Sequence, residues 1–583
     1  MHALDWLVVA VYLGGTLALG MWLARKGSAS LAEFLVGGRA VPWWLAGASM
    51  AAITFNVDTP LYVAGLVARR GIAGNWEWWS FAFAHVLMAF VLARLWRRAE
   101  VMTDAELTEL RYGGRAAAIL RGTRALLFAI PINCLGIGYG MLAMRKVLLA
   151  LGVVDALHLP GDAGLWAVVL IVAITLAYAA ASGLWGVVTT DFVQLVLALG
   201  GAFLIGWIAV VDVGGLGALR ERLAATGHAD ALRMVPRPGE ALGVVLRPGD
   251  AALPFGTFLA YLTIQWWSFR NADGGGMFVQ RLSSVKDERS AERAAGLFNI
   301  INNVVRPWPW VIVALAALVV LPDLQDPEMA YPLMMQRYLP AGLLGLVFAS
   351  LLAAFMSTVS TQVNWGASYI VRDVYQRFVA RDAGQARLVL VARLASVLIT
   401  VLAAAASFAM SDVGRIFRFI ILIGNGSGTV LLLRWFWWRV NAWAEWSALL
   451  AGPVIALLTT FVPALAGLSF GVKLALTAFG ALAIWLPVML VTAPERPEVL
   501  DRFYRKARPG GPGWRIVRER VGLAPATDLG RDLGEGAGAL AQVLGAMLAL
   551  GGLVTGSTAW ALGGTVALAA GTGGRRLTRL GRG

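Results

Sequence analysis

The chain has 583 residues, of which 59% are hydrophobic and only 14% are charged, with a mean hydropathy of +0.71. Soluble domains carry about 25% charged residues, so the composition excludes an ordinary soluble protein and indicates a polytopic membrane protein. The net charge is +15. Basic residues lie mainly in short loops between apolar runs, where contact with anionic lipid explains them; we expect the lipid bilayer as a partner and no nucleic acid.

Apolar runs of the length that crosses a bilayer, about 20 residues, recur along the chain. They lie around residues 4–24, 42–68, 76–96, 123–151, 163–182, 187–212, 253–279, 296–321, 341–370, 389–411, 415–435, 446–467 and 472–493. A last apolar stretch, 539–571, is interrupted by Gly556, Ser557 and Thr558 and forms either one long span or a tight hairpin. The sequence therefore predicts an all-α polytopic membrane protein with about 13 to 15 transmembrane helices.

Lysine and arginine concentrate in alternate loops, which indicates the orientation of the chain because cytoplasmic loops accumulate these residues. The pattern places the N-terminus outside and favours a hairpin at 539–571, which brings the basic C-terminal tail to the cytoplasm. The opening MHALDW has no basic segment, and no small-residue cleavage site follows, so we expect the first span to stay as an anchor and not to be a signal peptide. We expect a multi-pass protein of the bacterial cytoplasmic (inner) membrane.

Two of the predicted spans contain polar residues where a regular helix is expected. In the second span, Thr54, Asn56, Asp58, Thr59 and Pro60 separate two apolar halves. Proline lacks a backbone N–H and disfavours the helical conformation of the residue before it, which places a break at Thr59 and Pro60.

The seventh span is interrupted by SFRNADGGGMF, residues 268–278, which contains Arg270, Asn271, Asp273 and three successive glycines. Non-helical backbone at membrane depth must be buried in protein or face a water-filled cavity. For each segment alone a simpler interpretation stays open: the glycines form a helix-end loop, and Asp58 is a buried polar residue with its bonds satisfied.

The two interrupted spans are five apart, as expected if spans two to six and seven to eleven form two repeats. An odd number of spans per repeat gives the repeats opposite orientations in the membrane. Interrupted helices in corresponding positions point to a transporter site near the bilayer midplane, where unwound backbone binds solute.

The ninth span carries Ser357 and Thr358, followed by Ser360 and Thr361, so one face of this helix presents hydroxyl oxygens. Hydroxyls in membrane helices commonly bond to a preceding carbonyl, and that interpretation stays open. A hard cation needs several oxygen ligands, however, and carbonyls of an unwound second span would supply more of them.

Four stretches together resemble the sodium:solute symporter family, over about residues 1–495. They are LAEFLVGGRAVPWWLAGASMAA, SGLWGVVTTDFVQ, FVQRLSS and LLAAFMSTVSTQ. The resemblance implies a leucine-transporter-like bundle of two inverted five-helix repeats. It also implies a sodium site made by the carbonyls of Ala52, Phe55 and Ala354 and the hydroxyls of Ser357 and Thr358.

The resemblance further implies that Asp191, in TTDFVQ, assists sodium entry or release on the cytoplasmic side. It points to Asp58, Thr59, Trp266 and Trp267 as solute contacts.

Asn271 and Asp273, in the seventh-span interruption, complete the predicted solute-binding set. That interruption departs from the family pattern, so the family's own contacts do not extend through residues 268–276. Arg270 either pairs with a carboxylate of the solute or with Asp273 or Asp58.

The expected function is sodium-coupled symport of a small polar organic solute, a sugar, amino acid or monocarboxylate, into the cell by alternating access. The expected ligands are sodium and the solute, with no cofactor and no enzymatic activity, in a monomer or weak oligomer. Two alternatives stay open: proton coupling through Asp58 or Asp191, and a transporter-like sensor or interaction protein.

The predicted organisation follows from the spans and loops. The segments are an extra N-terminal helix with the first loop (1–40), the first repeat (41–212), an extracytoplasmic loop (213–252), the second repeat (253–440), accessory helices (441–495), a cytoplasmic loop (496–538) and a C-terminal hairpin or helix with a basic tail (539–583).

Overall fold

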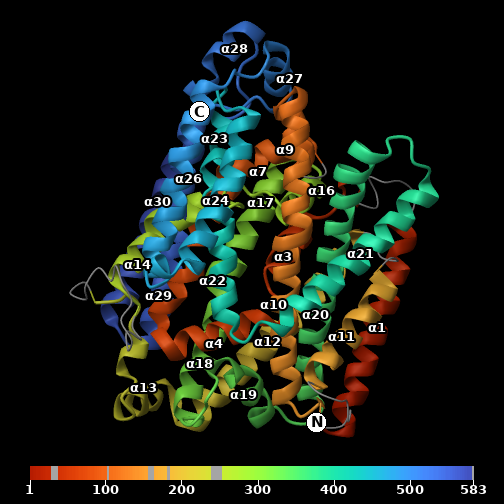
Figure 1. Cartoon of the computed structure of the whole chain (residues 1–583). Coiled ribbons are helices and arrows are strands. Elements are labelled where there is room, and N and C mark those ends of the chain that lie inside the picture. Colours follow the sequence, from red (N-terminus) through yellow and green to blue (C-terminus); the bar gives the residue numbers. More distant parts are fainter. Residues whose placement is uncertain (28–36, 102–103, 155–162, 180–183, 238–252, 581–583) are drawn as a thin grey trace.

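A computed structural model describes residues 1–27, 37–101, 104–154, 163–179, 184–237 and 253–580. The described chain is an elongated bundle of helices, with the N-terminus at one end and the last helix ending near the other (Figure 1). Within these residues the only β-structure is two isolated bridges, Val41 with Val285 and Phe269 with Asn425. We name the two ends of the bundle the N-terminal end and the α27–α28 end.

The helices of the N-terminal half begin with α1, which packs against α12 and α20. Their bounds are α1 Ala3–Gly27, α3 Trp43–Ile53, α4 Asp58–Arg70, α5 Trp76–Trp79, α6 Phe81–Leu87, α7 Ala93–Ala99, α8 Asp104–Arg111, α9 Gly114–Leu127, α10 Asn133–Ala150, α11 Ala163–Ala179, α12 Leu184–Val213 and α13 Gly215–Ala225. Short 3-10 or π segments join several of them, including Met88–Leu92 and Phe128–Ile132.

The second half repeats the alternation of long and interrupted helices. Its bounds are α14 Phe255–Ala260, α15 Trp266–Ser268, α16 Met277–Ser284, α17 Glu288–Asn299, α18 Pro307–Val320, α19 Ala330–Tyr338, α20 Leu343–Ser368, α21 Gln385–Phe408, α22 Val413–Gly424, α23 Gly428–Phe436, α24 Ala442–Phe461, α25 Pro463–Ala466, α26 Phe470–Val491, α27 Pro497–Ala507, α28 Arg515–Val521, α29 Leu529–Thr555 and α30 Thr558–Leu580.

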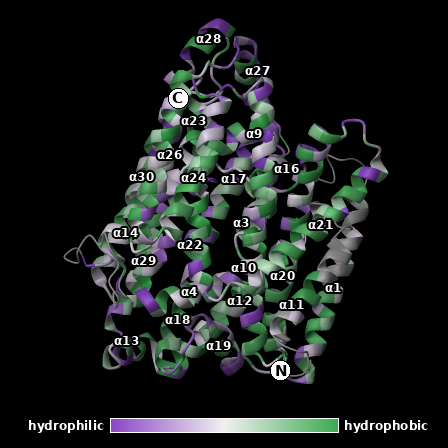
Figure 2. Cartoon of the chain, in the orientation of Figure 1, coloured by the Kyte–Doolittle hydropathy of each residue, from purple (hydrophilic) through white to green (hydrophobic). Residues whose placement is uncertain are grey.

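The surface of the bundle matches a lipid environment. Hydrophobic residues cover the long sides of the helices, and hydrophilic ones gather toward the two ends (Figure 2). On α21, Leu390, Leu394 and Val401 are each more than half exposed. Nine helices of the described residues are long and apolar enough to cross a membrane, or ten with the bent pair α3 and α4. The all-α membrane class is confirmed, whereas the predicted total of 13 to 15 spans stays a prediction.

The second span is broken, as expected, but at a different residue. Helix α3 ends at Ile53 and α4 begins at Asp58, with a bend of 57° between them. Pro60 lies in the first turn of α4, where its missing N–H costs no helical bond, so the break precedes the proline. Within the break, the side-chain oxygen of Asn56 accepts a hydrogen bond of 2.8 Å from the amide of Val57.

The seventh span is broken over residues 269–276, between α15 and α16. Gly274 and Gly276 have φ values of +76° and +72°, which side chains rarely adopt. The exposed backbone groups find partners on other helices: the amide of Arg270 donates to the carbonyl of Gly424 at 2.7 Å, and the indole of Trp96 donates to the carbonyl of Asp273 at 2.6 Å.

A third break, between α22 and α23, was missed by the sequence analysis. It covers residues 425–427 and lies directly against the seventh-span break. A Cβ atom at Gly428 would lie 2.4 Å from the carbonyl oxygen of Phe269, so only glycine permits this approach. The signal in the sequence is the run GNGSG, residues 424–428, inside an otherwise apolar stretch.

The C-terminal region contains helices where a cytoplasmic loop, 496–538, was expected. It also shows which of the two forms expected for 539–571, one long span or a hairpin, the chain adopts. Helices α29 and α30 form a hairpin, and α29 begins at Leu529, because Asp528 caps it by accepting from the amide of Arg531. The preceding segment folds into α27 and α28, with Trp514 buried and its indole donating to the carbonyl of Trp435. Of the predicted extracytoplasmic loop, 213–252, the described part contains α13, and residues 238–252 lie outside the described residues.

Candidate functional site

A small cavity of about 10 Å³ lies where the break after α3 faces α12 and α20. All five residues predicted as sodium ligands, together with Asp191, contribute to its wall. The lining residues are Ala52, Ile53, Phe55, Asp191, Gln194, Met277, Ala354, Ser357, Thr358 and Thr361. About 10 Å³ is the space that one water-sized body needs, so the cavity suits a single small ion or water.

The helix break determines which backbone atoms of α3 reach this cavity. Ala52 lies in the last turn of α3, and Phe55 lies in the non-helical segment that follows. The carbonyl of Ala52 accepts from the amide of Phe55 at 2.9 Å, which turns the chain back toward its own helix end. Phe55 stacks on Trp310 with ring centroids 5.4 Å apart, so its position is fixed by packing.

Asp191 on α12 connects three helices around the cavity. Its carboxylate accepts from the hydroxyl of Ser49 at 2.6 Å and from that of Ser357 at 3.3 Å. The guanidinium of Arg281, on α16, lies 3.6 Å from the same carboxylate. Asp191 is 2% exposed, so its charge acts in a buried setting where electrostatic effects are strong.

The chemistry of this wall is that of a hard-cation site. It combines one carboxylate, the Ser357, Thr358 and Thr361 hydroxyls and backbone carbonyls at a helix break. Such cations prefer carboxylate, carbonyl and hydroxyl oxygens over nitrogen or sulfur. The residues present therefore fit sodium as a transported ion.

A second, larger cavity of about 80 Å³ adjoins the first. It is lined by Asp104, Arg124, Phe128, Ile132, Asn133, Gly136, Arg270, Asn271, Gly276, Met277, Thr361, Gln362, Trp365 and Ile420. Met277 and Thr361 belong to both walls. A ligand in one cavity is therefore separated from a ligand in the other by single side chains.

Of the six predicted solute contacts, the structure brings only Asn271 to the larger cavity. Asp58 and Thr59 lie in the first turn of α4, where Asp58 interacts with Tyr139 and Arg306. Neither lines the larger cavity.

The two predicted tryptophan contacts face other helices. Trp266 stacks on Phe83 at 5.8 Å between centroids. Trp267 packs edge-on against Phe479 at 5.9 Å. Neither ring lines either of the two cavities.

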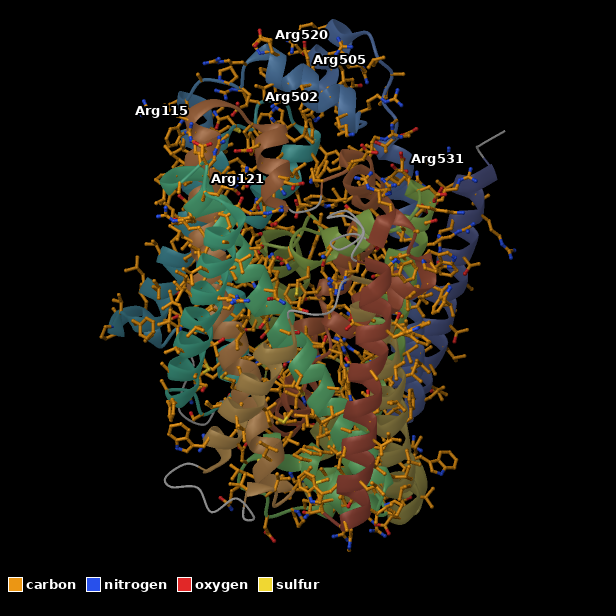
Figure 3. The ribbon with its side chains drawn as sticks, turned by 90° about the vertical axis from the view of Figure 1, so that its right-hand side faces the viewer. Arg115, Arg121, Arg502, Arg505, Arg520 and Arg531 are labelled. Atoms are coloured by element: carbon orange, nitrogen blue, oxygen red, sulfur yellow. The ribbon has the colours of Figure 1, made fainter. Side chains whose placement is uncertain are left out.

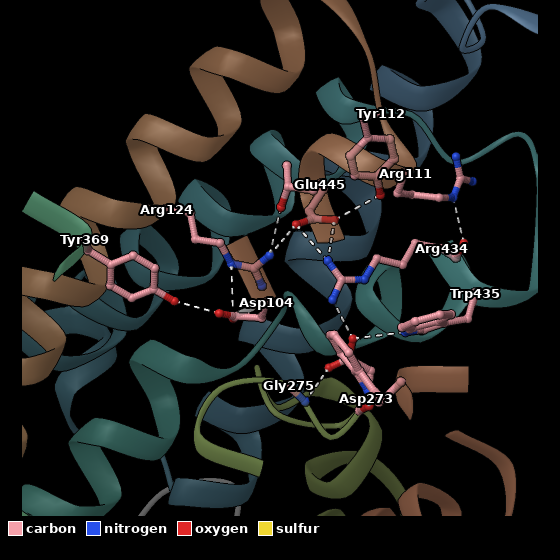
Figure 4. Close-up of polar contacts among 12 residues, drawn as sticks. Asp104, Arg111, Tyr112, Arg124, Asp273, Gly275, Tyr369, Arg434, Trp435 and Glu445 are labelled. Carbon is pink, nitrogen blue, oxygen red and sulfur yellow. Dashed lines mark hydrogen bonds and ion pairs between the residues drawn. The ribbon is translucent and has the colours of Figure 1, made fainter. Parts of the chain in front are cut away.

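Asp273 belongs to a buried ion-pair network rather than to the cavity wall (Figure 4). Its carboxylate pairs with Arg434 at 2.6 Å and accepts from the amide of Gly275 at 3.0 Å. Arg434 in turn pairs with Glu445, whose carboxylate also binds Arg124 at 2.9 Å. The predicted role of Asp273 in solute binding thus has no support from its position, because its carboxylate is engaged in fixing the seventh-span break.

Several residues in or beside the two cavities were not predicted from the sequence. Ser49 and Arg281 hold Asp191, and Asn133 and Gln362 line the larger cavity. Asn133 is a polar residue inside an apolar run, which is a signal that could have been used. Ser49 is a small residue in a small-residue helix, and its sequence context gives no such signal.

At the N-terminal end, buried acidic residues tie the helices together. Glu77 accepts from the hydroxyls of Tyr62 and Tyr261, both at 2.9 Å, and pairs with Arg70 at 2.9 Å and Arg418 at 3.7 Å. These contacts join α4, α5, α22 and the seventh span.

Glu328 forms a second tie at the same end. It accepts from the amides of Val413 and Gly414, both at 2.9 Å, and pairs with Lys146. This tie joins α10 to the start of α22.

The comparisons with known proteins agree with this arrangement. The chain is 26% identical to the sodium/glucose cotransporter of Vibrio parahaemolyticus over 491 residues, 79% of this chain and 86% of that protein. It is also 26% identical to sodium/glucose cotransporter 4 of Mus musculus over 494 residues, 79% of this chain and 69% of that one.

The solved structure of a Na⁺-coupled sialic acid symporter in a substrate-bound outward-open state aligns with a TM-score of 0.66 at 19% identity. The alignment covers 85% of this chain and 99% of that one, and it shows that the two share a fold. The model of the sodium:solute symporter family matches residues 34–452. The chain belongs to the sodium:solute symporter family.

Proposed function

We propose that this protein couples inward flow of sodium to uptake of a small polar organic solute by alternating access. The observation that carries the proposal is the oxygen-lined cavity between Ala52 and Ser357, which adjoins a larger cavity through Thr361 and Met277. Sodium in the small cavity would hold α3 against α12 and α20, and its release would loosen that contact. The membrane potential would contribute to the driving energy, since each positive charge that moves inward gains about 2.3 kcal/mol per 100 mV.

The contacts of the N-terminal end suit one half of the transport cycle. Glu77 and Glu328 tie the helices at that end, whereas Asn364 and Ser368, in the half of α20 nearer the α27–α28 end, are exposed. Polar side chains exposed on a membrane helix favour a water-filled path. This arrangement supports a state that is closed at the N-terminal end and accessible from the other.

We propose that the α27–α28 end faces the cytoplasm of a bacterial cell and that the N-terminus lies outside. Arg115, Arg121, Arg502, Arg505, Arg520 and Arg531 all lie toward this end (Figure 3). Cytoplasmic segments of membrane proteins carry an excess of such residues.

Thermal unfolding of the purified full chain in sodium chloride and in choline chloride tests sodium binding. A ligand of the folded state raises the unfolding midpoint, by an amount that grows with its concentration. We expect a sodium-dependent rise in the natural chain and a several-fold higher half-effective sodium concentration in Thr358→Ala.

Ser350→Ala is the matched control, since this hydroxyl is on the same helix, bonds to the carbonyl of Val347 and does not line the cavity. Equal midpoints in the two salts, together with a dependence on pH, would favour proton coupling instead.

A further inference from the structure

Arg270, in the seventh-span break, carries a guanidinium without a direct polar partner. Its Nε and Nη1 atoms are buried and make no hydrogen bond to any described residue. The group lies over the rings of Phe128 and Phe269, 5.3 and 5.7 Å from their centroids, and it lines the larger cavity. The two rings hold the guanidinium in position, but an aromatic ring offers its N–H groups no oxygen or nitrogen acceptor.

The acidic residues that could neutralise Arg270 are committed elsewhere. Asp273, the acid nearest in sequence, pairs with Arg434 at 2.6 Å. Asp104 shares the cavity wall, but it accepts from the hydroxyl of Tyr369 at 2.6 Å and lies 3.8 Å from Arg124. Its attraction for Arg270 acts only at longer range, because the described residues contain no carboxylate within 4.0 Å of that guanidinium.

Asp58, the other partner considered from the sequence, interacts with Tyr139 and Arg306 instead. Both pairings of Arg270 within the chain that the sequence left open are therefore absent from the structure. A guanidinium whose buried N–H groups lack a counter-ion carries a desolvation penalty, which an anionic ligand would offset.

Two further polar groups of the same wall lack partners. The side-chain oxygens Oδ1 of Asn133 and Oε1 of Gln362 are buried and accept no hydrogen bond from a described residue. Both are acceptors, so they suit hydroxyl or amino groups of a ligand. The amide nitrogen of Asn133 donates to the backbone carbonyl of Gln362 at 2.8 Å, which holds the Asn133 side chain against that part of α20.

The rest of the wall contains polar residues, Asp104, Arg124, Asn271 and Thr361, and an apolar part that suits an organic ligand better than a bare inorganic anion. Phe128, Ile132, Trp365 and Ile420 contribute to this apolar part. Its volume of about 80 Å³ is several times the 10 to 15 Å³ that one water needs, so a molecule of several non-hydrogen atoms fits.

We propose that the solute of this symporter is a small organic carboxylate with hydroxyl or amino groups, whose carboxylate binds the guanidinium of Arg270 and whose donors bind Asn133 and Gln362. The inference rests on the proposed function in one respect, namely that the bound carboxylate is the molecule transported. The binding site itself is defined by the contacts of this cavity. Arginine suits this role because its planar fork matches the two oxygens of a carboxylate.

The test uses lactate as the probe, because it is a small member of the class, and lactamide as a neutral analogue of similar shape. The unfolding midpoint of the purified full chain is measured in sodium-containing buffer of constant ionic strength with 50 mM of either compound. We expect lactate to raise the midpoint by about 2 °C or more and lactamide to leave it unchanged. No rise with lactate, or an equal rise with lactamide, overturns the proposal.

Two substitutions of Arg270 test whether the lactate-induced rise of the unfolding midpoint depends on this residue. Arg270→Gln is expected to abolish the lactate shift, whereas Arg270→Lys, which keeps the charge but loses the fork, retains a smaller one. An undiminished shift in Arg270→Gln overturns the assignment. If that variant does not fold, Arg270→Lys decides, since a shift equal to that of the natural chain contradicts recognition by the fork.

The design separates this inference from the proposed function. A sodium-dependent rise without lactate tests the symporter, and it is expected to persist in Arg270→Gln and to weaken in Thr358→Ala. A lactate shift that needs Arg270 in a protein indifferent to sodium would leave the carboxylate site standing and remove the sodium coupling. A sodium response without any lactate shift would support sodium coupling and overturn the carboxylate site.

Discussion

Ser357 on α20 donates a hydrogen bond of 3.3 Å to the carboxylate of Asp191 on α12, in the wall of the cavity that also contains Ala52. The sequence predicted both residues for sodium handling, but it gave them separate roles, one in binding and one in release. Their contact means that a cation among the hydroxyls would lie close to a buried negative charge.

Asp191→Asn is therefore expected to weaken sodium binding strongly. Two unit charges about 4 Å apart attract by about 4 kcal/mol at an effective dielectric constant of 20, and about 1.4 kcal/mol corresponds to a factor of ten. We expect the half-effective sodium concentration, measured by thermal unfolding, to rise at least about tenfold. Asp212→Asn, at the exposed end of the same helix, is the control. An unchanged sodium dependence in Asp191→Asn would show that Asp191 does not contribute to sodium binding.

The Arg434–Asp273 pair is expected to maintain the seventh-span break. Arg434 is 1% exposed and Asp273 is 0% exposed, so removing one partner leaves a buried charge. Arg434→Gln should lower the free energy of unfolding by about 3–5 kcal/mol, observed as a large fall of the unfolding midpoint. Arg515→Gln, which breaks an exposed pair with Glu519, should leave the midpoint unchanged. Similar midpoints for both variants would show that the buried pair does not stabilise the fold.

Glu77 is expected to keep the N-terminal end closed. Glu77→Gln removes the negative charge between Arg70 and Arg418 and should shift the population toward a state open at this end. The single natural cysteine, Cys134, is buried, so a Cys134→Ala background allows a reporter at Phe417, a ring packed on Tyr62.

A membrane-impermeant maleimide should label Phe417→Cys about tenfold faster when Glu77 is glutamine, which corresponds to a shift of about 1.4 kcal/mol. The exposed Glu221→Gln is the matched control. Equal labelling rates in the two variants would exclude Glu77 as a gate residue.

The crossing of two helix breaks makes Gly428 essential for folding. A Cβ at this position would lie 2.4 Å from the carbonyl of Phe269, which is backbone and cannot move aside easily. Gly428→Ala is expected to lower the unfolding midpoint sharply, whereas Gly200→Ala on α12, which has open space around it, should keep or slightly raise it. A stable Gly428→Ala protein would contradict the close crossing.

The sequence was sufficient for the features that depend on composition and local chemistry. The apolar runs predicted the membrane class, and Pro60 and the three glycines predicted two broken spans, because proline and glycine act on the backbone wherever they occur. The predicted sodium ligands, which were taken from the resemblance to the sodium:solute symporters, lie around one cavity. Proteins that share a fold bring the same helix faces together, so the resemblance carried this information. The exact start of the second-span break, at Thr54, depended on how α4 accommodates Pro60.

The features that the sequence could not supply depend on partners distant in the chain. Asp273 reads as a solute ligand until Arg434, 161 residues later, is seen to neutralise it. The sequence is equally consistent with a paired and an unpaired Arg270. Its guanidinium lacks a partner because the carboxylates of Asp273 and Asp104 bind other residues. The loop before α29 looked unstructured because its tryptophan core forms with Trp435 of another segment.

The most direct measurement is a pair of high-resolution electron cryomicroscopy maps of the purified protein, one in sodium chloride and one in choline chloride. The account predicts density for an ion between the carbonyl of Ala52 and the hydroxyls of Ser357 and Thr358 in sodium, and its loss in choline. Identical maps at that position under saturating sodium would contradict it.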